Sequence, residues 1–206
     1  MNRLMAFMYD RMMRGGEAAG LSEARRAVLA PAHGAVLEIG AGTGLNLRAY
    51  PRTGIDRLVV LEPDANMARH MADKLADAPL TPEIVHAPAE RIPFADDTFD
   101  VVAGTLVLCE PEDPALVLAE VARVLKPGGH FLFYEHVRSD EPGLARWQDR
   151  LGKVWTACSG GCHCNRTTLA TIEASPLTVE HVDAVELPKA PPLVRPAISG
   201  SAVLPG

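Results

Sequence analysis

The sequence predicts an α/β fold in which a mostly parallel sheet is flanked by helices. Two observations predict it. A short apolar run at 36–39 leads directly into a glycine-rich turn at 40–44, the pattern of a buried parallel strand followed by a tight turn. Further apolar runs then alternate with amphipathic segments as far as residue 136, which is typical of parallel strands joined by right-handed crossovers. The length of 206 residues suits one domain with a sizeable core.

The first thirty residues are expected to form a helical lid. Apolar residues recur at helical spacing over 4–13, and the glycines at 15–16 are expected to end that helix. A second helix is predicted over 21–30, with Ser22 as its cap. The first helix either packs into the core or moves over a pocket, where Tyr9 and the methionines would adapt to an apolar substrate. A weak contact with a membrane surface is a third interpretation.

The turn at 40–44 carries the pattern Glu-x-Gly-x-Gly-x-Gly, which begins at Glu38. A phosphate-binding P-loop requires Gly-Lys-Ser/Thr, and Leu45 follows Gly44 here. The dinucleotide fingerprint would need glycine at 45 or 47, and both positions are leucine. A short helix is expected over about 45–50, with its first N–H groups available to a ligand. A glycine turn that binds no ligand is the alternative.

A second strand, predicted over 57–61, ends at Glu62, which lies 22 residues after Gly40. An acid at this distance accepts hydrogen bonds from ribose hydroxyls in nucleotide-binding α/β folds. The helix that follows is expected to run from Asp64 to Leu75, and Asp64 is expected to favour its positive end. Met67 either packs on a bound base or fills the core.

The remaining parallel strands are predicted over 83–86, 101–108 and 130–136, and a helix from Asp113 to about 125 precedes the last of them. The carboxyl ends of parallel strands meet at one edge of a sheet, and ligands bind there. Four polar strand-end residues would therefore converge, namely Glu38, Glu62, Thr105 and His136. Two more strands, near 178–184 and 198–204, would complete a Rossmann-like seven-stranded sheet whose last strand is antiparallel.

The cysteines are at 109, 158, 162 and 164. The tight spacing at 162–164 and the absence of a second Cys/His pair in the sequence argue against structural zinc, so we expect no metal. The alternatives are a loop that covers a pocket, with Cys162 buried, or a redox-sensitive thiol pair. Cys109 is expected to be a small buried apolar residue.

The formal charge of −6 argues against nucleic acid as a partner. The longest apolar run, 101–109, is too short for a transmembrane segment, and the amino end lacks the apolar core of a signal peptide. We therefore expect a cytoplasmic protein with reduced thiols. The chain could be a monomer or a homodimer.

The glycine pattern resembles motif I of the class I S-adenosylmethionine (SAM) methyltransferases. Later motifs are more specific: Thr-Leu-Val-Leu-Cys at 105–109, Glu-His-Val at 135–137, Gly-Cys-x-x-x-Arg at 161–166 and Leu-Val-Arg-Pro at 193–196. Together they resemble the methyltransferase-like seven family, the alkyl thiol S-methyltransferases, over nearly all of 33–206. Two features depart from that family. The long apolar amino-terminal membrane segment of its animal members is missing, and Gly-Ala-Gly at 40–42 stands in place of Gly-Cys-Gly.

The resemblance implies that SAM is the cofactor, S-adenosylhomocysteine (SAH) the product and a small-molecule thiol the acceptor. One alternative is methylation of an O, N or C centre in a lipid or natural product. Another is a SAM-binding or redox-sensing regulatory protein without turnover. The expected architecture is a single domain over 1–206, with the lid at 1–30 and a helical and loop cap over the acceptor pocket at 137–175.

The resemblance also implies site residues. Those expected at the cofactor are Glu38, Gly40, Ala41, Gly42, Gly44, Glu62, Pro63, Met67, Ala89, Glu90, Thr105 and Leu106. Those expected around the acceptor are Tyr9, Glu135, Cys162, Asn165, Arg166 and Arg195. We hypothesise that His136 is catalytic and assists deprotonation of the acceptor or orients it. The alternative is a structural, hydrogen-bonded His136.

Overall fold

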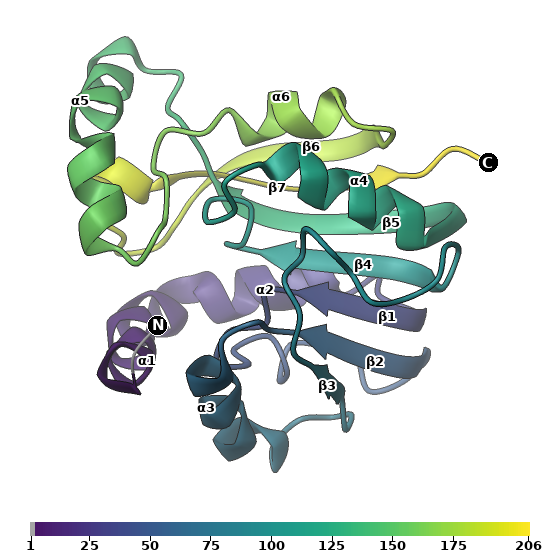
Figure 1. Cartoon of the computed structure of the whole chain (residues 1–206). Coiled ribbons are helices and arrows are strands. Elements are labelled where there is room, and N and C mark those ends of the chain that lie inside the picture. The colour runs from purple at the N-terminus through teal and green to yellow at the C-terminus, as the bar shows by residue number, and fades with distance from the viewer. Residues whose placement is uncertain (1–2) are drawn as a thin grey trace.

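A seven-stranded sheet runs through the molecule in the order β3-β2-β1-β4-β5-β7-β6 (Figure 1). The structure, a computed structural model, describes the backbone of residues 3–206 and the side chains of residues 9–206. The strands are β1 Gly34–Ile39, β2 Ile55–Leu61, β3 Glu83–Val85, β4 Phe99–Thr105, β5 Leu125–His136, β6 Thr178–Glu186 and β7 Pro196–Val203. Strands β1 to β5 pair in parallel, whereas β7 pairs antiparallel with both β5 and β6. The predicted fold class is confirmed.

Helices cover both faces of this sheet. They are α1 Arg3–Gly16, η1 Glu17–Leu21, α2 Ser22–Leu29, α3 Ala65–Leu75, α4 Pro114–Val124, α5 Pro142–Cys158, α6 Thr168–Glu173 and η2 Pro192–Val194. Successive residues of β1 point to opposite faces of the sheet. Val36 belongs to the core under α2 and α3, whereas Leu37 belongs to the core under α4 and α6. Side chains that alternate between two covered faces are typical of central parallel strands. The sheet is therefore held by two cores, one on each side.

The strand order reverses beside β1, because the chain first extends to β2 and β3 and then returns to β4 on the other side. The carboxyl ends of β1 and β4 flank this switch point, where α/β sheets bind ligands. Figure 1 shows α1 and α5 standing at the same edge of the sheet, one on each side of these strand ends. The expected lid and cap segments thus both border the predicted site.

Several details differ from the sequence-based expectations, and β5 for instance begins at Leu125 rather than at 130. The first helix continues through the glycines at 15–16, and the backbone breaks at Gly20, whose φ is 123°. Ser22 does not cap a helix, since its hydroxyl donates to the Glu17 carbonyl at 3.1 Å. Strand β4 ends at Thr105 rather than at 108, because Leu106 adopts a φ of 58°, which no strand allows.

The helix expected over 45–50 is absent from the described chain, and this prediction was wrong. Residues 42–49 form consecutive turns. Hydrogen bonds three residues apart link Gly44 to Ala41, Leu47 to Gly44 and Ala49 to Asn46. The left-handed conformations of Gly42 and Gly44 and the inward side chain of Asn46 prevent a regular helix. Residues at 42–50 therefore present side chains and backbone to the site from several directions.

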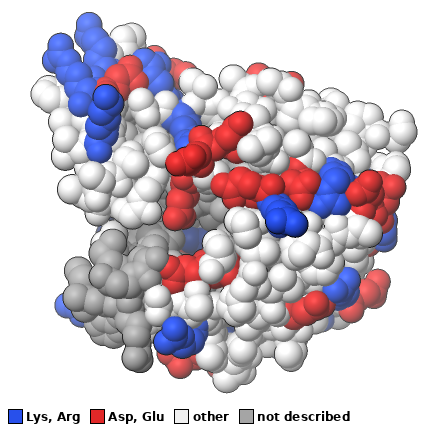
Figure 2. Space-filling model, in the orientation of Figure 1, with Lys and Arg blue, Asp and Glu red and all other residues white. Residues whose placement is uncertain are grey.

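Helix α5 leaves part of its apolar surface exposed. Trp147, Leu151 and Val154 are 56%, 37% and 63% exposed and lie on one face of the helix. The basic residues of α5 form an adjacent stripe, and Figure 2 shows Lys and Arg gathered on this part of the surface. None of the described helices is long and apolar enough to cross a bilayer.

Candidate functional site

The glycine turn after β1 excludes side chains at two of its positions. Gly40, Gly42 and Gly44 have φ angles of 61°, 57° and 79°. A Cβ at Gly40 would lie 2.3 Å from a methyl group of Val107, and one at Gly44 would lie 2.6 Å from Met71. Both approaches are far inside van der Waals contact, so these glycines are needed for both conformation and space. Ala41 between them is buried, as a small residue in such a turn must be.

Glu62 fastens this turn to the start of α3. Its carboxylate accepts hydrogen bonds from the amides of Gly42 at 2.7 Å and Asp64 at 2.8 Å. Only 6% of Glu62 is exposed, and burial raises the pKa of its carboxyl. Each carboxylate oxygen has a second lone pair, so Glu62 can still accept hydrogen bonds from hydroxyl groups of a ligand.

The residues predicted to enclose the base come from the start of α3 and from the loop between β3 and β4. Pro63 is exposed and Met67 is buried, with its terminal methyl 3.5 Å from the position of a Cβ at Gly42. Asp64 is the N-cap of α3, and its carboxylate accepts hydrogen bonds from the amides of Asn66 and Met67. It therefore stabilises the helix through direct hydrogen bonds as well as through its charge. Ala89 is buried and Glu90 half-buried in the loop between β3 and β4.

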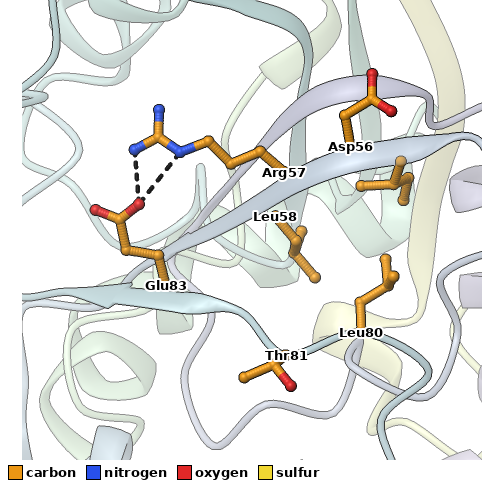
Figure 3. A pocket seen from close by; sticks show the side chains of 7 residues that line it. Asp56, Arg57, Leu58, Leu80, Thr81 and Glu83 are labelled. Carbon is orange, nitrogen blue, oxygen red and sulfur yellow. Dashed lines mark hydrogen bonds and ion pairs between the residues drawn. The ribbon is translucent and has the colours of Figure 1, made fainter.

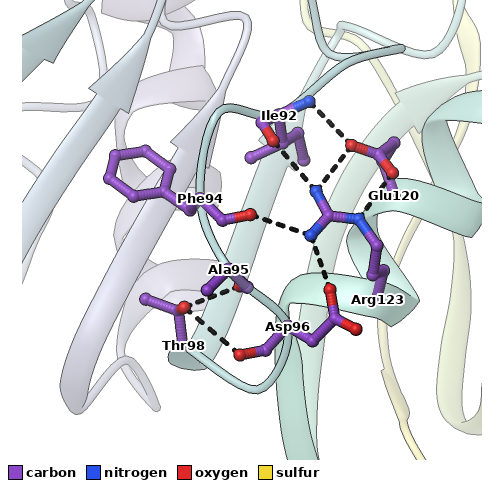
Figure 4. A network of polar contacts seen from close by, with 7 residues as sticks. All are labelled: Ile92, Phe94, Ala95, Asp96, Thr98, Glu120 and Arg123. Carbon is purple, nitrogen blue, oxygen red and sulfur yellow. Dashed lines mark hydrogen bonds and ion pairs between the residues drawn. The ribbon is translucent and has the colours of Figure 1, made fainter.

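Arg123 of α4 holds that loop in place (Figure 4). Its guanidinium donates to the carbonyls of Ile92 at 2.9 Å and Phe94 at 2.8 Å, and it pairs with Glu120 and Asp96. Glu120 in turn accepts from the Ile92 amide at 2.8 Å. The planar guanidinium has five N–H donors, so it can bond two carbonyls and two carboxylates at the same time. The sequence analysis did not single out Arg123 for this function.

A buried polar network lies behind the first strand end. Glu38 is 1% exposed and accepts from the Asn46 amide at 3.0 Å and the Tyr50 hydroxyl at 2.9 Å. Asn46 also donates to the Thr105 hydroxyl, which accepts from Arg25, and both distances are 2.8 Å. Sequence reasoning predicted Glu38 and Thr105 but missed Asn46, Tyr50 and Arg25.

Arg25 is the unexpected member, because an arginine of α2 is 3% exposed. It donates to Asn46 at 2.8 Å and pairs with Glu17 at 2.9 Å. A signal was present in the sequence, since Arg25 shares helical spacing with the buried residues Leu21 and Val28. An arginine on the apolar face of an amphipathic helix indicates a buried partner.

The Glu38 network makes a prediction about pH. Burial raises the pKa of the Glu38 carboxyl to about 7, despite hydrogen bonds from Tyr50 and Asn46 that oppose the shift. A carboxyl whose pKa is higher in the folded state contributes stability that is fully present below its unfolded pKa, near 4.3, and is lost as pH rises through about 7. Relative to Glu38→Gln, the wild type is expected to lose up to about 3 kcal/mol of unfolding free energy between pH 4.5 and 8.

Urea unfolding of the two proteins at both pH values measures this double difference, in which other titrating groups such as Glu135 cancel. Glu83→Gln is the matched control, because Glu83 is exposed and pairs with Arg57 on the surface. A double difference near zero for Glu38→Gln would show that Glu38 stays ionised in the fold.

Helix α1 is fastened to the glycine turn by Asp10. Its carboxylate accepts from the Thr43 hydroxyl at 2.5 Å and from Lys74 of α3 at 2.6 Å. Tyr9 is half-buried, and burial raises its pKa to about 12 against the opposing effect of the nearby Arg25 guanidinium. The structure therefore brings Tyr9 to the site, together with Asp10, which sequence reasoning did not single out.

Sulfur and imidazole groups meet beyond the carboxyl ends of β4 and β5. His136 is 4% exposed, and its Nε2 lies 3.1 Å from Cys162 Sγ. Trp155 donates its indole N–H to the same sulfur at 3.4 Å. Hydrogen bonds from Cys109, His136 and Trp155 lower the pKa of Cys162 to about 4, and the same contact raises the pKa of the buried Cys109. Cys162 is therefore the more acidic of the two thiols.

Glu135, next to His136 on β5, has a different environment. It is fully buried, accepts from the amides of Val107 at 2.9 Å and Leu108 at 3.2 Å, and has a pKa raised to about 7 by burial. It therefore fixes the turn that carries Leu106 to Cys109. Within the described structure, its second oxygen and His136 Nδ1 have no hydrogen-bond partner.

Of the other residues predicted around the acceptor, Arg166 and Asn165 lie in or beside the loop that follows α5, whereas Arg195 lies apart. Arg166 is half-buried and contacts His163 and the Pro111 carbonyl, close to the cysteine and histidine cluster. Asn165 contacts Asp149 of α5 at 3.2 Å and joins the loop to that helix. Arg195 is exposed and donates to the Ala190 carbonyl, a contact that does not connect it to the rest of the site.

Two shallow hollows lie away from the glycine turn. One is formed at the amino ends of β2 and β3, where Arg57 and Glu83 pair across its rim (Figure 3). The other lies beside α6 and includes His163 and Arg166. Because parallel sheets bind ligands at the carboxyl ends, the hollow in Figure 3 is on the wrong side for the predicted site.

Comparisons with known proteins agree with this geometry. The model of a family described as a methyltransferase domain matches residues 37–133. The chain is 33% identical over 172 residues to thiol S-methyltransferase TMT1A of Homo sapiens, an alignment that covers 82% of this chain and 70% of that protein. It is 36% identical over 183 residues to thiol S-methyltransferase TMT1B of Rattus norvegicus, with the same coverage.

Solved structures share the fold. A SAM-dependent methyltransferase from Thermotoga maritima superposes with a TM-score of 0.71 at 19% identity, covering 98% of this chain and 97% of that one. A SAM-dependent methyltransferase from Mesorhizobium loti gives 0.68 at 21% identity, covering 92% and 100%.

Proposed function

Because the chain belongs to the thiol S-methyltransferase family of class I SAM-dependent methyltransferases, we propose that it methylates the sulfur of a small-molecule thiol. One observation carries the choice of thiol over other acceptors. Two thiols, Cys109 and the half-buried Cys162, lie beside the buried imidazole of His136 beyond β4 and β5, in an environment adapted to sulfur. The relatives that act on thiols, by their names, support the same choice.

In this proposal the cofactor lies across the glycine turn. Glu62 would accept hydrogen bonds from the ribose, since its oxygens retain free lone pairs. Met67 and Ala89 would enclose the base, and the loop of Glu90 is held for this purpose by Arg123. The amino acid end of SAM would lie over Thr105 and Leu106, with Glu38 behind it in the polar network.

The cofactor supplies an activated methyl group, so the protein mainly has to orient the acceptor, exclude water and provide a thiolate. A free thiol has a pKa of about 8.5 and is only a few per cent ionised at neutral pH. Tyr9 and the loop at 159–167 would exclude water above the acceptor. His136 would act at the acceptor sulfur or hold the group that does, because its Nε2 is already occupied by Cys162.

A panel of acceptors tests this proposal. The purified protein is incubated with SAM and small alkyl or aryl thiols, phenols, amines and lipid headgroups, and methylated products are identified by mass spectrometry. We expect thioethers from the thiols, with the rate lost in Glu62→Ala. Methylated phenols, amines or lipids without thioethers would overturn the thiol assignment. Tight SAM binding with no product from any acceptor would instead favour a regulatory protein.

A further inference from the structure

Three metal-ligating side chains converge from segments that are far apart in the sequence. Cys109 follows β4, His136 ends β5 and Cys162 lies in the loop between α5 and α6. Their ligand atoms all lie within 4.8 Å of one another, and His136 Nε2 is 3.1 Å from Cys162 Sγ. Cys109 and His136 are 5% and 4% exposed. Among the residues that the structure describes, no other group of three or more such side chains brings its ligand atoms this close together.

We propose that Cys109, His136 and Cys162 bind one zinc ion and leave its fourth coordination position to the acceptor thiol. Zinc sites that perform chemistry use three protein ligands and an open position, and two cysteines with one histidine is an established set. Tetrahedral bonds of about 2.3 Å to sulfur and 2.0 Å to nitrogen place the ligand atoms roughly 3.5–3.8 Å apart. The observed spacing needs only small side-chain adjustments to reach this.

The other two cysteines do not belong to this group. Cys158 is exposed at the end of α5. Cys164 is buried, and its thiol donates to the Gln148 carbonyl at 3.7 Å. The sequence alone predicted no metal because Cys162 and Cys164 are tightly spaced and no second Cys/His pair is visible in the sequence. The fold separates them and supplies Cys162 with partners from β4 and β5 instead.

The position of the cluster suits methyl transfer. Cys109 ends the turn at 106–109, and Val107 of this turn lies against Gly40 of the glycine turn, because a Cβ at Gly40 would be 2.3 Å from a Val107 methyl group. Glu110 follows Cys109 directly. Gly161, beside Cys162, approaches Glu110, with 3.4 Å between its Cβ position and the Glu110 side chain. The cluster thus lies next to the glycine turn, where the cofactor is proposed to bind.

The zinc role rests on the proposed function, and its chemistry balances. The acceptor R–SH binds zinc through sulfur and releases its proton to solvent, because coordination deprotonates a thiol. A sulfur lone pair then forms a bond to the methyl carbon of SAM while the bond from that carbon to the sulfonium sulfur breaks. The electron pair of the broken bond stays on SAH. The neutral thioether R–S–CH₃ is a weaker ligand than a thiolate and leaves the metal.

Metal binding is tested on the full chain without any acceptor. The reduced, metal-free protein is titrated with Zn²⁺ alone, and with Co²⁺ as a spectroscopic substitute, and metal content is measured after gel filtration. We expect one equivalent of either metal and the thiolate-to-cobalt charge-transfer bands of a tetrahedral site. Cys109→Ser and Cys162→Ser should each weaken zinc binding at least 10-fold, whereas Cys158→Ser and Cys164→Ser should leave it unchanged.

The outcomes separate the two proposals. Less than a tenth of an equivalent in the reduced wild type, a Cys109–Cys162 disulfide that forms in place of metal binding, or full binding by Cys162→Ser would each overturn the zinc site. The wild-type cobalt spectrum reports on the ligands even where a variant fails to fold. Stoichiometric zinc without thioether product would overturn the thiol function but leave the metal site. Equal turnover with and without zinc would overturn the role of the metal.

Discussion

Replacing Glu62 with alanine is expected to weaken binding of both SAM and SAH at least about 100-fold. A hydrogen bond to a charged group contributes roughly 1.5–3 kcal/mol, and two ribose hydroxyls would lose such a bond. The same change releases the amides of Gly42 and Asp64, so the glycine turn loses its attachment to α3. Glu62→Gln, which keeps acceptor capacity without the charge, should fall between wild type and alanine. Calorimetric titration with SAH measures all three affinities.

The control must remove a carboxylate from a neighbouring strand at a position away from the proposed cofactor site. Glu83→Ala does so, because Glu83 begins β3 at the opposite edge of the sheet and pairs with Arg57 at the surface (Figure 3). Its SAH affinity should equal that of the wild type. Unfolding curves show whether each variant is folded at the titration temperature. Unchanged SAH affinity in folded Glu62→Ala would place the ribose elsewhere and remove the basis of the proposed cofactor site.

The parts of the fold that follow from periodic patterns were predictable from the sequence. Each parallel strand is a short apolar run followed by a polar residue, so the amino-acid pattern by itself predicts Glu38, Glu62, Thr105 and His136 at one edge of the sheet. In the structure, Glu38 and Thr105 share the Asn46 side chain, and Glu62 holds the neighbouring turn.

The parts that depend on tertiary contacts were not predictable in the same way. The segment at 45–50 has helix-compatible residues, but Asn46 bonds Glu38 and Thr105 across the sheet instead of pointing outward. Local propensity gives no account of such a contact. Cys162 likewise belongs, in the sequence, to a group of three clustered cysteines, and only the fold shows that it meets His136 and Cys109. A ligand set drawn from three distant segments has no spacing rule that would reveal it.

Arg25 gives the second large effect, and it concerns stability. Replacing it with methionine keeps the apolar stem but removes the donor to the Asn46 side-chain oxygen and to the Glu17 carboxylate, and leaves Thr105 with Asn46 as its donor. Removing one partner of a buried charged pair costs about 3–5 kcal/mol. Since Glu17 keeps some solvent contact, with 18% of its side chain exposed, we expect the lower end, about 3 kcal/mol. For a chain of this size that lowers Tm by roughly 6–12 °C.

Arg26→Met is the matched control, because it changes the same residue type one position later on α2. The Arg26 side chain is 58% exposed and pairs with Glu23, whose side chain is 69% exposed, at 3.4 Å. Such surface pairs contribute little, so its unfolding free energy should stay within about 0.5 kcal/mol of wild type. Both variants remove one positive charge, so a difference between their unfolding free energies reports the effect of burial. If Arg25→Met and Arg26→Met unfolded at the same temperature, water would be satisfying Asn46 and Thr105, and the network would orient the site without stabilising the fold.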